Sequence, residues 1–351
     1  MNVTDKPKQR AVVICPGRGT YNKEELGYLS RLHADKEQMI DVIDANRRAN
    51  NQPSVTELDN MDKYAMRLHT AGENASSLIY ACAHGDFADI NTDEYEIVAV
   101  SGNSMGWYIA LAVAQTLDPK NAIELINTMG SMMTSGVIGG QMIYPVMDKN
   151  WQLSPTIQQQ VQDCLQDVNA IDDCEVYDSI YLGGYLVIGG NEAGLKQLDN
   201  RLPKVDDTYP MRLFNHAAFH TPLLKSISEK AKQTLGEEMF QAPAIPLIDG
   251  QGKIWQPYST STQNLYDYTL GHQVTEPYDF SAAISVALKE FAPDKLIILG
   301  PGSTLGGAVG QCLVANNWQH ISSKKDFIAR QKNDPFVLAM GLAEQRKHVV
   351  E

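Results

Sequence analysis

Short apolar runs alternate along the chain with longer stretches whose apolar residues recur at helical spacing. Apolar runs of about four to eight residues between turn residues indicate buried strands, and apolar positions about three to four residues apart indicate amphipathic helices. The pattern predicts strands at Ala11–Cys15, Glu96–Ser101 and Lys295–Leu299, and helices at Glu24–Asp35, Lys36–Arg48, Asp62–His84, Trp107–Thr116, Asp118–Ser131, Pro222–Leu235 and Pro277–Phe291. Strands that alternate with helices indicate an α/β fold with a mostly parallel sheet.

The pattern changes between about Gly139 and Leu202. Here it predicts strands at Gln141–Met147, Glu175–Leu182 and Tyr185–Ile188 and helices at Thr156–Val168 and Glu192–Arg201, with a strand to follow at Thr208–Phe214. This order of elements is the split βαβ, or ferredoxin-like, arrangement. We therefore expect residues 1–137 and 208–351 to form a large domain with an α/β-hydrolase-like core, and residues 138–207 to form an inserted ferredoxin-like subdomain.

Composition narrows the class of protein. With 351 residues, 43% of them hydrophobic, the chain is long enough to bury a large core. A net charge of −13 without a long basic stretch argues against a nucleic acid partner. Five scattered cysteines form no C-x-x-C pair, so neither a disulfide framework nor a zinc site is implied. The polar N-terminal segment and the lack of an apolar run of about 18 residues predict a cytoplasmic protein without membrane contact.

The main chemical signal is the G-x-S-x-G pattern Gly102-Asn103-Ser104-Met105-Gly106, which lies between a predicted strand and a predicted helix. In a nucleophile elbow of this kind the serine projects from a sharp turn, and only glycine tolerates the crowding on either side. The helix that follows directs free N–H groups at an oxyanion beside the serine. The pattern therefore predicts acyl transfer or hydrolysis through an ester of Ser104, the alternative being a tight turn without catalytic function.

A nucleophilic serine needs a base, and the segment from Asn215 to Leu224 offers two histidines. His220 lies just before a helix that begins with Pro222, at a loop edge where its ring can face a cleft. His216 is a second candidate with the same chemistry. The alternative is that His220 has only a structural role, near the cap of that helix.

Four landmarks occur in an order that resembles the malonyl-CoA:acyl carrier protein transacylase family over nearly the whole chain. They are Pro16-Gly17-Arg18-Gly19-Thr20, the elbow around Ser104, Ala217-Ala218-Phe219-His220 and Leu299-Gly300-Pro301-Gly302. The resemblance implies an acyltransferase of fatty acid or polyketide biosynthesis. Acyl-CoA would be a substrate rather than a tightly bound cofactor, no metal would be needed, and the acceptor would be the phosphopantetheine thiol of an acyl carrier protein. A monomer is expected, because family members are often monomers.

The resemblance also implies the roles of five residues. Ser104 would be the nucleophile and His220 its base, and a backbone carbonyl of the segment that carries Gln273 would orient the histidine. The backbone N–H groups of Met105 and Arg18 would form the oxyanion hole. Two such amides directed at a tetrahedral oxyanion are worth about 3–4 kcal/mol each.

One departure from the family concerns the acyl group. Where the family has the arginine that binds the malonyl carboxylate, this chain has Met129, followed by Gly130. A thioether cannot replace a bidentate guanidinium, so a carboxylated acyl group would be left unpaired in an enclosed pocket. The substitution favours an uncharged acyl group such as acetyl or a longer fatty acyl. The alternative is that another cation binds malonyl, and Arg18 is the obvious candidate.

Three further residues bear on the substrate pocket. Asn103 replaces the histidine of the family's elbow, and Trp107 replaces a glutamate. We expect Trp107 to pack behind the elbow, the alternative being that it narrows the mouth of the site. Phe219 resembles the bulky residue that, in the family, accompanies acyl groups unbranched at the α carbon.

The sequence is also compatible with other functions. A thioester hydrolase would use the same Ser104–His220 pair with water as the acceptor, and a non-catalytic module of an assembly line would not need the pair at all. An ordinary α/β-hydrolase would need an acidic residue between Ser104 and a late histidine, together with an H-G-G-G-type loop. Neither feature is evident.

Overall fold

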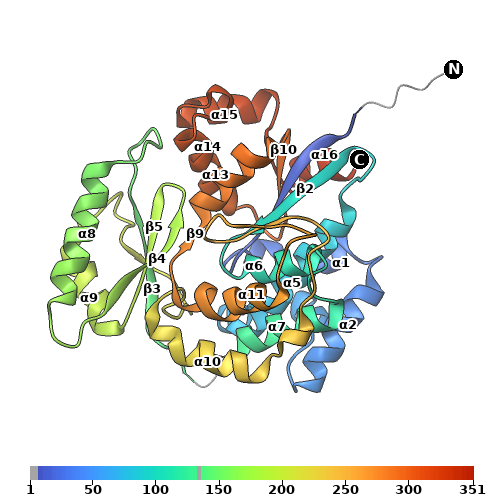
Figure 1. Ribbon diagram of the computed structural model, residues 1–351, viewed down its shortest axis with the longest axis horizontal. Coiled ribbons are helices and arrows are strands. Elements are labelled where there is room, and N and C mark those ends of the chain that lie inside the picture. Colours follow the sequence, from blue (N-terminus) through green and yellow to red (C-terminus); the bar gives the residue numbers. More distant parts are fainter. Residues whose placement is uncertain (1–6, 133–135) are drawn as a thin grey trace.

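The computed structural model describes residues 7–132 and 136–351, and its larger sheet has six strands in the order β11-β10-β1-β2-β7-β8 (Figure 1). Five of them are parallel, and β8 pairs antiparallel with β7. The strands are β1 (Gln9–Cys15), β2 (Tyr95–Gly102), β7 (Leu247–Ile248), β8 (Ile254–Trp255), β10 (Lys295–Ile298) and β11 (Val337–Ala339). Because helices cover this sheet, the apolar run of β1 is fully buried, as the pattern predicted.

Helices make up most of the rest of the described chain. They are α1 (Tyr28–Leu32), α2 (Glu37–Ala49), α3 (Val55–Asp59), α4 (Met66–His69), α5 (Gly72–Asp89), α6 (Gly106–Val113), α7 (Pro119–Ser131), α8 (Pro155–Asn169), α9 (Glu192–Arg201), α10 (Lys225–Thr234), α11 (Thr262–Asp267), α12 (Gln273–Thr275), α13 (Phe280–Phe291), α14 (Leu305–Ala315), α15 (Lys324–Asn333) and α16 (Ala343–Val350). Between α11 and α12, Tyr268–His272 forms a π-helical turn. No helix in the described ranges is both long and apolar enough to cross a membrane.

A second, mostly antiparallel sheet lies beside the first, with α8 and α9 on its outer side (Figure 1). Its order is β6-β3-β5-β4-β9, and the first four strands follow the order expected of a split βαβ unit. The strands are β3 (Gly140–Pro145), β4 (Val176–Leu182), β5 (Tyr185–Gly190), β6 (Met211–Arg212) and β9 (Tyr278–Asp279). This sheet and its helices have a hydrophobic cluster of their own, around Met142, Val161 and Ile188. The predicted α/β fold with a ferredoxin-like unit is confirmed, and strands from outside residues 138–207 complete the smaller sheet.

Four predicted elements differ from the structure. The helix predicted over Glu24–Asp35 is broken at Gly27, whose φ of 81° is left-handed, so that a short 3-10 helix at Lys23–Glu25 and α1 take its place. The helix predicted from Asp62 begins at Gly72, because Ala71 is extended and separates α5 from the short α4. Only Met211–Arg212 of the strand predicted over Thr208–Phe214 pairs with β3. The helix predicted from Pro277 begins at Phe280, because the two residues before it pair with β4.

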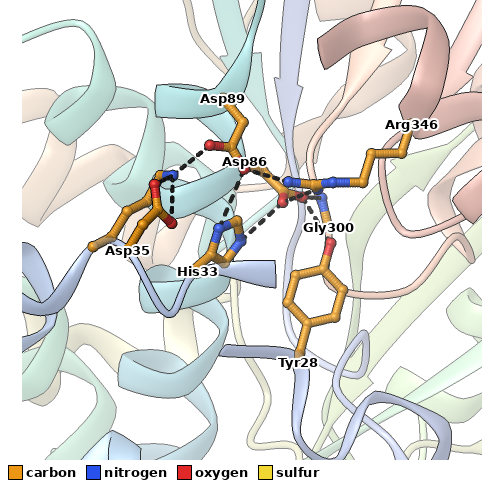
Figure 2. A network of polar contacts seen from close by, with 8 residues as sticks. Tyr28, His33, Asp35, Asp86, Asp89, Gly300 and Arg346 are labelled. Atoms are coloured by element: carbon orange, nitrogen blue, oxygen red, sulfur yellow. Dashed lines mark hydrogen bonds and ion pairs between the residues drawn. The ribbon is translucent and has the colours of Figure 1, made fainter. Parts of the chain in front are cut away.

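A buried polar network ties the C-terminal helix α16 to the rest of the fold (Figure 2). The carboxylate of Asp86, which is fully buried on α5, accepts hydrogen bonds from the Tyr28 hydroxyl (2.8 Å) and the Gly300 backbone N–H (2.6 Å). Arg346 of α16 forms ion pairs with both Asp86 and Asp89. Since buried carboxylates are stable only when they are paired, this network fixes α16 against α5 and the loop after β10.

We expect Arg346→Met to destabilise the protein by about 3–5 kcal/mol, because it leaves the Asp86 carboxylate buried without its arginine. Lys347→Met on the same helix is the matched control. Its partner Glu344 is 87% exposed, so the change is expected to stay within about 0.5 kcal/mol. Urea unfolding followed by circular dichroism measures both values. Equal effects of the two substitutions would show that the network does not stabilise this end of the fold.

Candidate active site

Ser104 lies at the tip of a strained turn between β2 and α6. Its φ of 56° is left-handed, which is unusual for a residue with a side chain. A Cβ atom on Gly102 would collide with the carbonyl oxygen of Gly106, and one on Gly106 would collide with that of Cys15 at the end of β1. The turn is closed by a hydrogen bond from the Gly106 N–H to the Asn103 carbonyl (2.8 Å). Both glycines are therefore required by packing, and Ser104 is presented at the end of the sheet.

His220 is the histidine that contacts this serine. The distance between Ser104 Oγ and His220 Nε2 is 2.7 Å, and His220 Nδ1 lies 2.6 Å from the backbone carbonyl of Gln273. Because a carbonyl can only accept, Nδ1 carries the proton and Nε2 is left to accept the proton of the serine hydroxyl. Burial lowers the pKa of His220 to about 4, although the hydrogen bond to Gln273 opposes that shift. The imidazole is therefore neutral at physiological pH.

Gln273 also supports the elbow through its side chain. Its Nε2 donates to the backbone carbonyl of Ser104 (3.1 Å), and its Oε1 accepts from the Tyr108 hydroxyl (2.8 Å). The hydroxyl of Tyr278 donates to the Gly102 carbonyl (2.6 Å), and its ring packs against that of His220. Sequence reasoning missed both tyrosines, because a buried tyrosine in a helix or short strand has the same signal as any core residue.

His216 belongs to a different network. Its Nδ1–H donates to Gln141 Oε1 (2.8 Å), and Gln141 Nε2 in turn donates to Ser179 Oγ (2.7 Å). Burial, together with the nearby Arg18, lowers the pKa of His216 to about 3. The structure therefore brings His220, and not His216, into contact with the nucleophile.

A small cavity opens beside Ser104 and His220. Its volume is about 60 Å³, and the sequence-predicted residues Arg18, Met105, Met129 and Phe219 contribute to its wall. The remaining wall residues are mostly apolar, and they are Ser76, Tyr108, Ile126, Gly130, Leu224, Ile227, Gln273 and Val274. The cavity is thus an apolar chamber in which Arg18 supplies the charge.

A larger groove of about 640 Å³ reaches Ser104 from the side of the smaller sheet. Asn103, Phe219 and Arg18 line it, as do Trp151 and Lys324 farther out. Trp107 lines neither space. It is fully buried, and its indole N–H donates to Thr269 Oγ1 (3.0 Å). Trp107 therefore packs behind the elbow, which is the first of the two placements considered for it.

The described residues contain one group with the spacing of a metal site, formed by His33, Asp86 and Asp89. Their ligand atoms lie within 4.8 Å of one another. Arg346 pairs with both carboxylates and Lys36 pairs with Asp89, so the negative charge of the group is already compensated. The group is accounted for as the buried network of Figure 2.

Comparisons with known proteins agree with the fold. No family model matches the chain. Over 224 residues the chain is 25% identical to the polyketide biosynthesis malonyl CoA-acyl carrier protein transacylase PksC of Bacillus subtilis, and the match covers 63% of this chain and 71% of that protein. The acyl-carrier-protein S-malonyltransferase of Burkholderia pseudomallei has a similar structure, with a TM-score of 0.74 and 17% identity over 97% of this chain and 99% of that one.

A malonyl-transacylase solved in complex with a type II polyketide synthase acyl-carrier protein gives a TM-score of 0.71 at 16% identity, over 97% of this chain and 99% of that one. At such identities the solved structures show the fold, and the sequence matches are to malonyl CoA-acyl carrier protein transacylases. The chain is therefore similar to the malonyl-CoA:acyl carrier protein transacylase family in both sequence and fold.

Proposed function

We propose that the protein transfers a short acyl group from coenzyme A to the phosphopantetheine thiol of an acyl carrier protein, through an ester on Ser104. The observation that carries this proposal is the hydrogen-bonded chain from Ser104 through His220 to the Gln273 carbonyl, at the edge of a small cavity. A serine with a neutral, oriented imidazole is an activated nucleophile. The relatives that share the fold are transacylases by name.

In the first half-reaction Ser104 Oγ attacks the thioester carbonyl, and its proton moves to His220 Nε2. The tetrahedral intermediate then collapses, the C–S bond breaks, and His220 returns the proton to the departing thiolate of coenzyme A. In the second half-reaction the carrier thiol gives its proton to His220 and attacks the ester carbonyl. The C–O bond to Ser104 breaks, and the serine regains its proton from His220.

The oxyanion of each tetrahedral intermediate would be held by the backbone N–H groups of Met105 and Arg18. Neither group donates a hydrogen bond to another described residue, whereas the next N–H groups, of Gly106 and Trp107, are occupied within the turn. Met105 also lies at the N-terminal end of α6, where the helix dipole favours negative charge. Two donors that are held in position in this way stabilise an oxyanion more than the same donors would in water.

The volume of the cavity supports a short acyl group. About 60 Å³ has room for only a few water molecules, and therefore for an acyl group of a few non-hydrogen atoms. Phe219 lies in the cavity wall together with His220. Its bulky ring leaves less space beside the histidine, which disfavours an acyl group branched at the α carbon. The larger groove that also reaches Ser104 has a volume of about 640 Å³, which is room for the pantetheine arm that carries the acyl group.

We expect wild-type protein to gain the mass of a short acyl group when it is mixed with malonyl-CoA or acetyl-CoA, and to lose it to a carrier protein with a free phosphopantetheine thiol. Octanoyl-CoA is expected to give no adduct. Ser104→Ala should abolish the adduct, and His220→Ala should slow its formation about 1000-fold, because the general base is lost. Intact mass spectrometry of quenched samples measures each step.

His84→Ala is the matched control for His220→Ala, because burial also lowers the pKa of this histidine to about 4, but it lines neither the cavity nor the groove. Its acylation rate is expected to stay within a few-fold of the wild type. Rapid loss of the adduct without a carrier protein would instead favour a thioester hydrolase. No adduct with any donor would contradict the proposed function and favour a non-catalytic module.

The pH dependence of acylation should follow the lowered pKa of His220. Because the imidazole is neutral above about pH 4, we expect the rate to stay constant from about pH 8 to about pH 5, and to fall only as the pH approaches 4. A histidine with its ordinary pKa of about 6.5 would halve the rate near that value.

Acid also lowers the stability of the folded protein, so stability and acylation rate both fall at low pH. A buried neutral histidine takes up its proton more readily in the unfolded chain, so the stability that it contributes is complete above about pH 6.5 and is lost as the pH falls toward 4. Circular dichroism at each pH therefore measures the folded fraction. Dividing the observed rate by this fraction gives the rate of the folded enzyme alone. A rate that still falls near pH 6.5 after this correction would contradict a buried, neutral His220.

A further inference from the structure

The end of one helix binds His220 twice. α11, the π-helical turn and α12 follow one another without a break over residues 262–275. At the end of this helix the Gln273 carbonyl accepts from His220 Nδ1 (2.6 Å), and the Val274 carbonyl accepts from the backbone N–H of His220 (3.1 Å). The last carbonyls of a helix have no partner within it, so they can accept from other donors. Ring and backbone of the histidine are therefore held by the same helix end.

Both bonds matter for the geometry of the base. The φ of His220 is 57°, a left-handed conformation that costs energy for a residue with a side chain and lasts only where its surroundings hold it. The bond to Val274 fixes this backbone. The bond to Gln273 fixes the proton on Nδ1, which leaves Nε2 to face Ser104 at 2.7 Å. Loss of these carbonyls would therefore free both the position and the tautomer of the ring.

Pro277 explains why the two carbonyls are available. In a helix that continued, the Gln273 carbonyl would accept from the N–H of the residue four positions later. That residue is Pro277, which has no N–H. A proline also disfavours helical backbone in the residue before it, and Glu276 is extended, with φ −121° and ψ 156°. Beyond the proline, Tyr278 pairs with Ile180 of β4. The chain thus leaves the helix at the point where His220 needs its carbonyls.

Packing does not account for a proline at this position. Pro277 is exposed, as is Glu276 before it, so the ring fills no space in the core. Two roles are left for it. It can stiffen the connection between α12 and β9, or it can prevent the helix from continuing. Glycine and alanine distinguish these roles, because alanine favours a helix, whereas glycine disfavours one and loosens the chain.

We propose that Pro277 is a positioning residue, which ends the helix at Thr275 so that two carbonyls stay free to hold the ring and the backbone of His220. The proposal rests on the proposed function, since it concerns the base that activates Ser104. The carbonyls at a helix end also carry partial negative charge. They therefore favour the imidazolium that forms when His220 takes the proton of Ser104.

The test compares Pro277→Ala with Pro277→Gly in single-turnover acylation of Ser104 by malonyl-CoA and acetyl-CoA. Both variants return an N–H that competes for the Gln273 carbonyl, but only alanine favours a longer helix. We expect Pro277→Ala to slow acylation about 3- to 10-fold, the loss that one competing hydrogen bond supports, and Pro277→Gly to slow it less. A proline that only stiffens the chain would give the opposite order, because glycine adds the most backbone freedom.

NMR of protein that carries isotope-labelled histidine reads the ring directly and needs no substrate. In the wild type we expect a neutral His220 with its proton on Nδ1, assigned by the loss of its signal in His220→Ala. In Pro277→Ala we expect part of the signal to move to the tautomer with the proton on Nε2. Pro119→Ala is the matched control. It removes an exposed proline at the first position of α7, where an N–H has no helical partner in any case, and it is expected to change neither rate nor ring signal.

Three outcomes would overturn the role of Pro277 while the proposed function stands. One is a rate and a ring signal in Pro277→Ala equal to those of the wild type. Another is a larger loss in Pro277→Gly than in Pro277→Ala, which would assign the effect to chain stiffness. The third needs no variant, and it is a wild-type ring with its proton on Nε2. Wild-type protein that forms no adduct, but whose ring signals respond to Pro277→Ala as expected, would overturn the proposed function and leave the positioning of His220 explained.

Discussion

The closeness of two backbone segments at the end of the large sheet determines the site. Gly106, at the start of α6, lies against the carbonyl of Cys15, and Gly17 in the loop after β1 lies against Asn103. With any side chain at position 106 the elbow would move away from β1. The strained φ of Ser104 is stable only because this packing surrounds it. The same contact holds the loop that carries Arg18 against the elbow, as the proposed oxyanion hole of Arg18 and Met105 requires.

The histidine is oriented by a neutral group, which suits the cavity that it faces. A carboxylate in the place of the Gln273 carbonyl would stabilise the protonated imidazole, but it would also place a charge in a buried and mostly apolar site. The carbonyl selects the same tautomer without that cost. Burial then keeps His220 neutral, which is the state that can take the proton of Ser104. Tyr278 bonds the backbone of the elbow directly, and Tyr108 supports it through the side chain of Gln273.

Much of this could be read from local sequence, because the physics involved is local. The apolar run of β1, the capped start of α7 at Asp118 and the two glycines around Ser104 follow from burial, capping and backbone sterics within a few residues. The order of strands and helices sufficed to predict a mostly parallel sheet with a ferredoxin-like unit. Where local signals were weak, as at Gly27 and before Phe280, the predicted helices were longer than the observed ones.

Contacts between distant parts of the chain were decided only by the tertiary structure. The choice between His220 and His216 could not be made from spacing, because both histidines are near the same helix and only packing brings one of them to Ser104. The partners of Gln273 and the position of the Arg18 guanidinium likewise depend on segments that are more than 50 residues apart. The sequence by itself therefore determined how an acyl group would be carried, on a serine in a strained turn. Which side chains surround that group depended on the tertiary fold, because side-chain packing is a property of the whole chain.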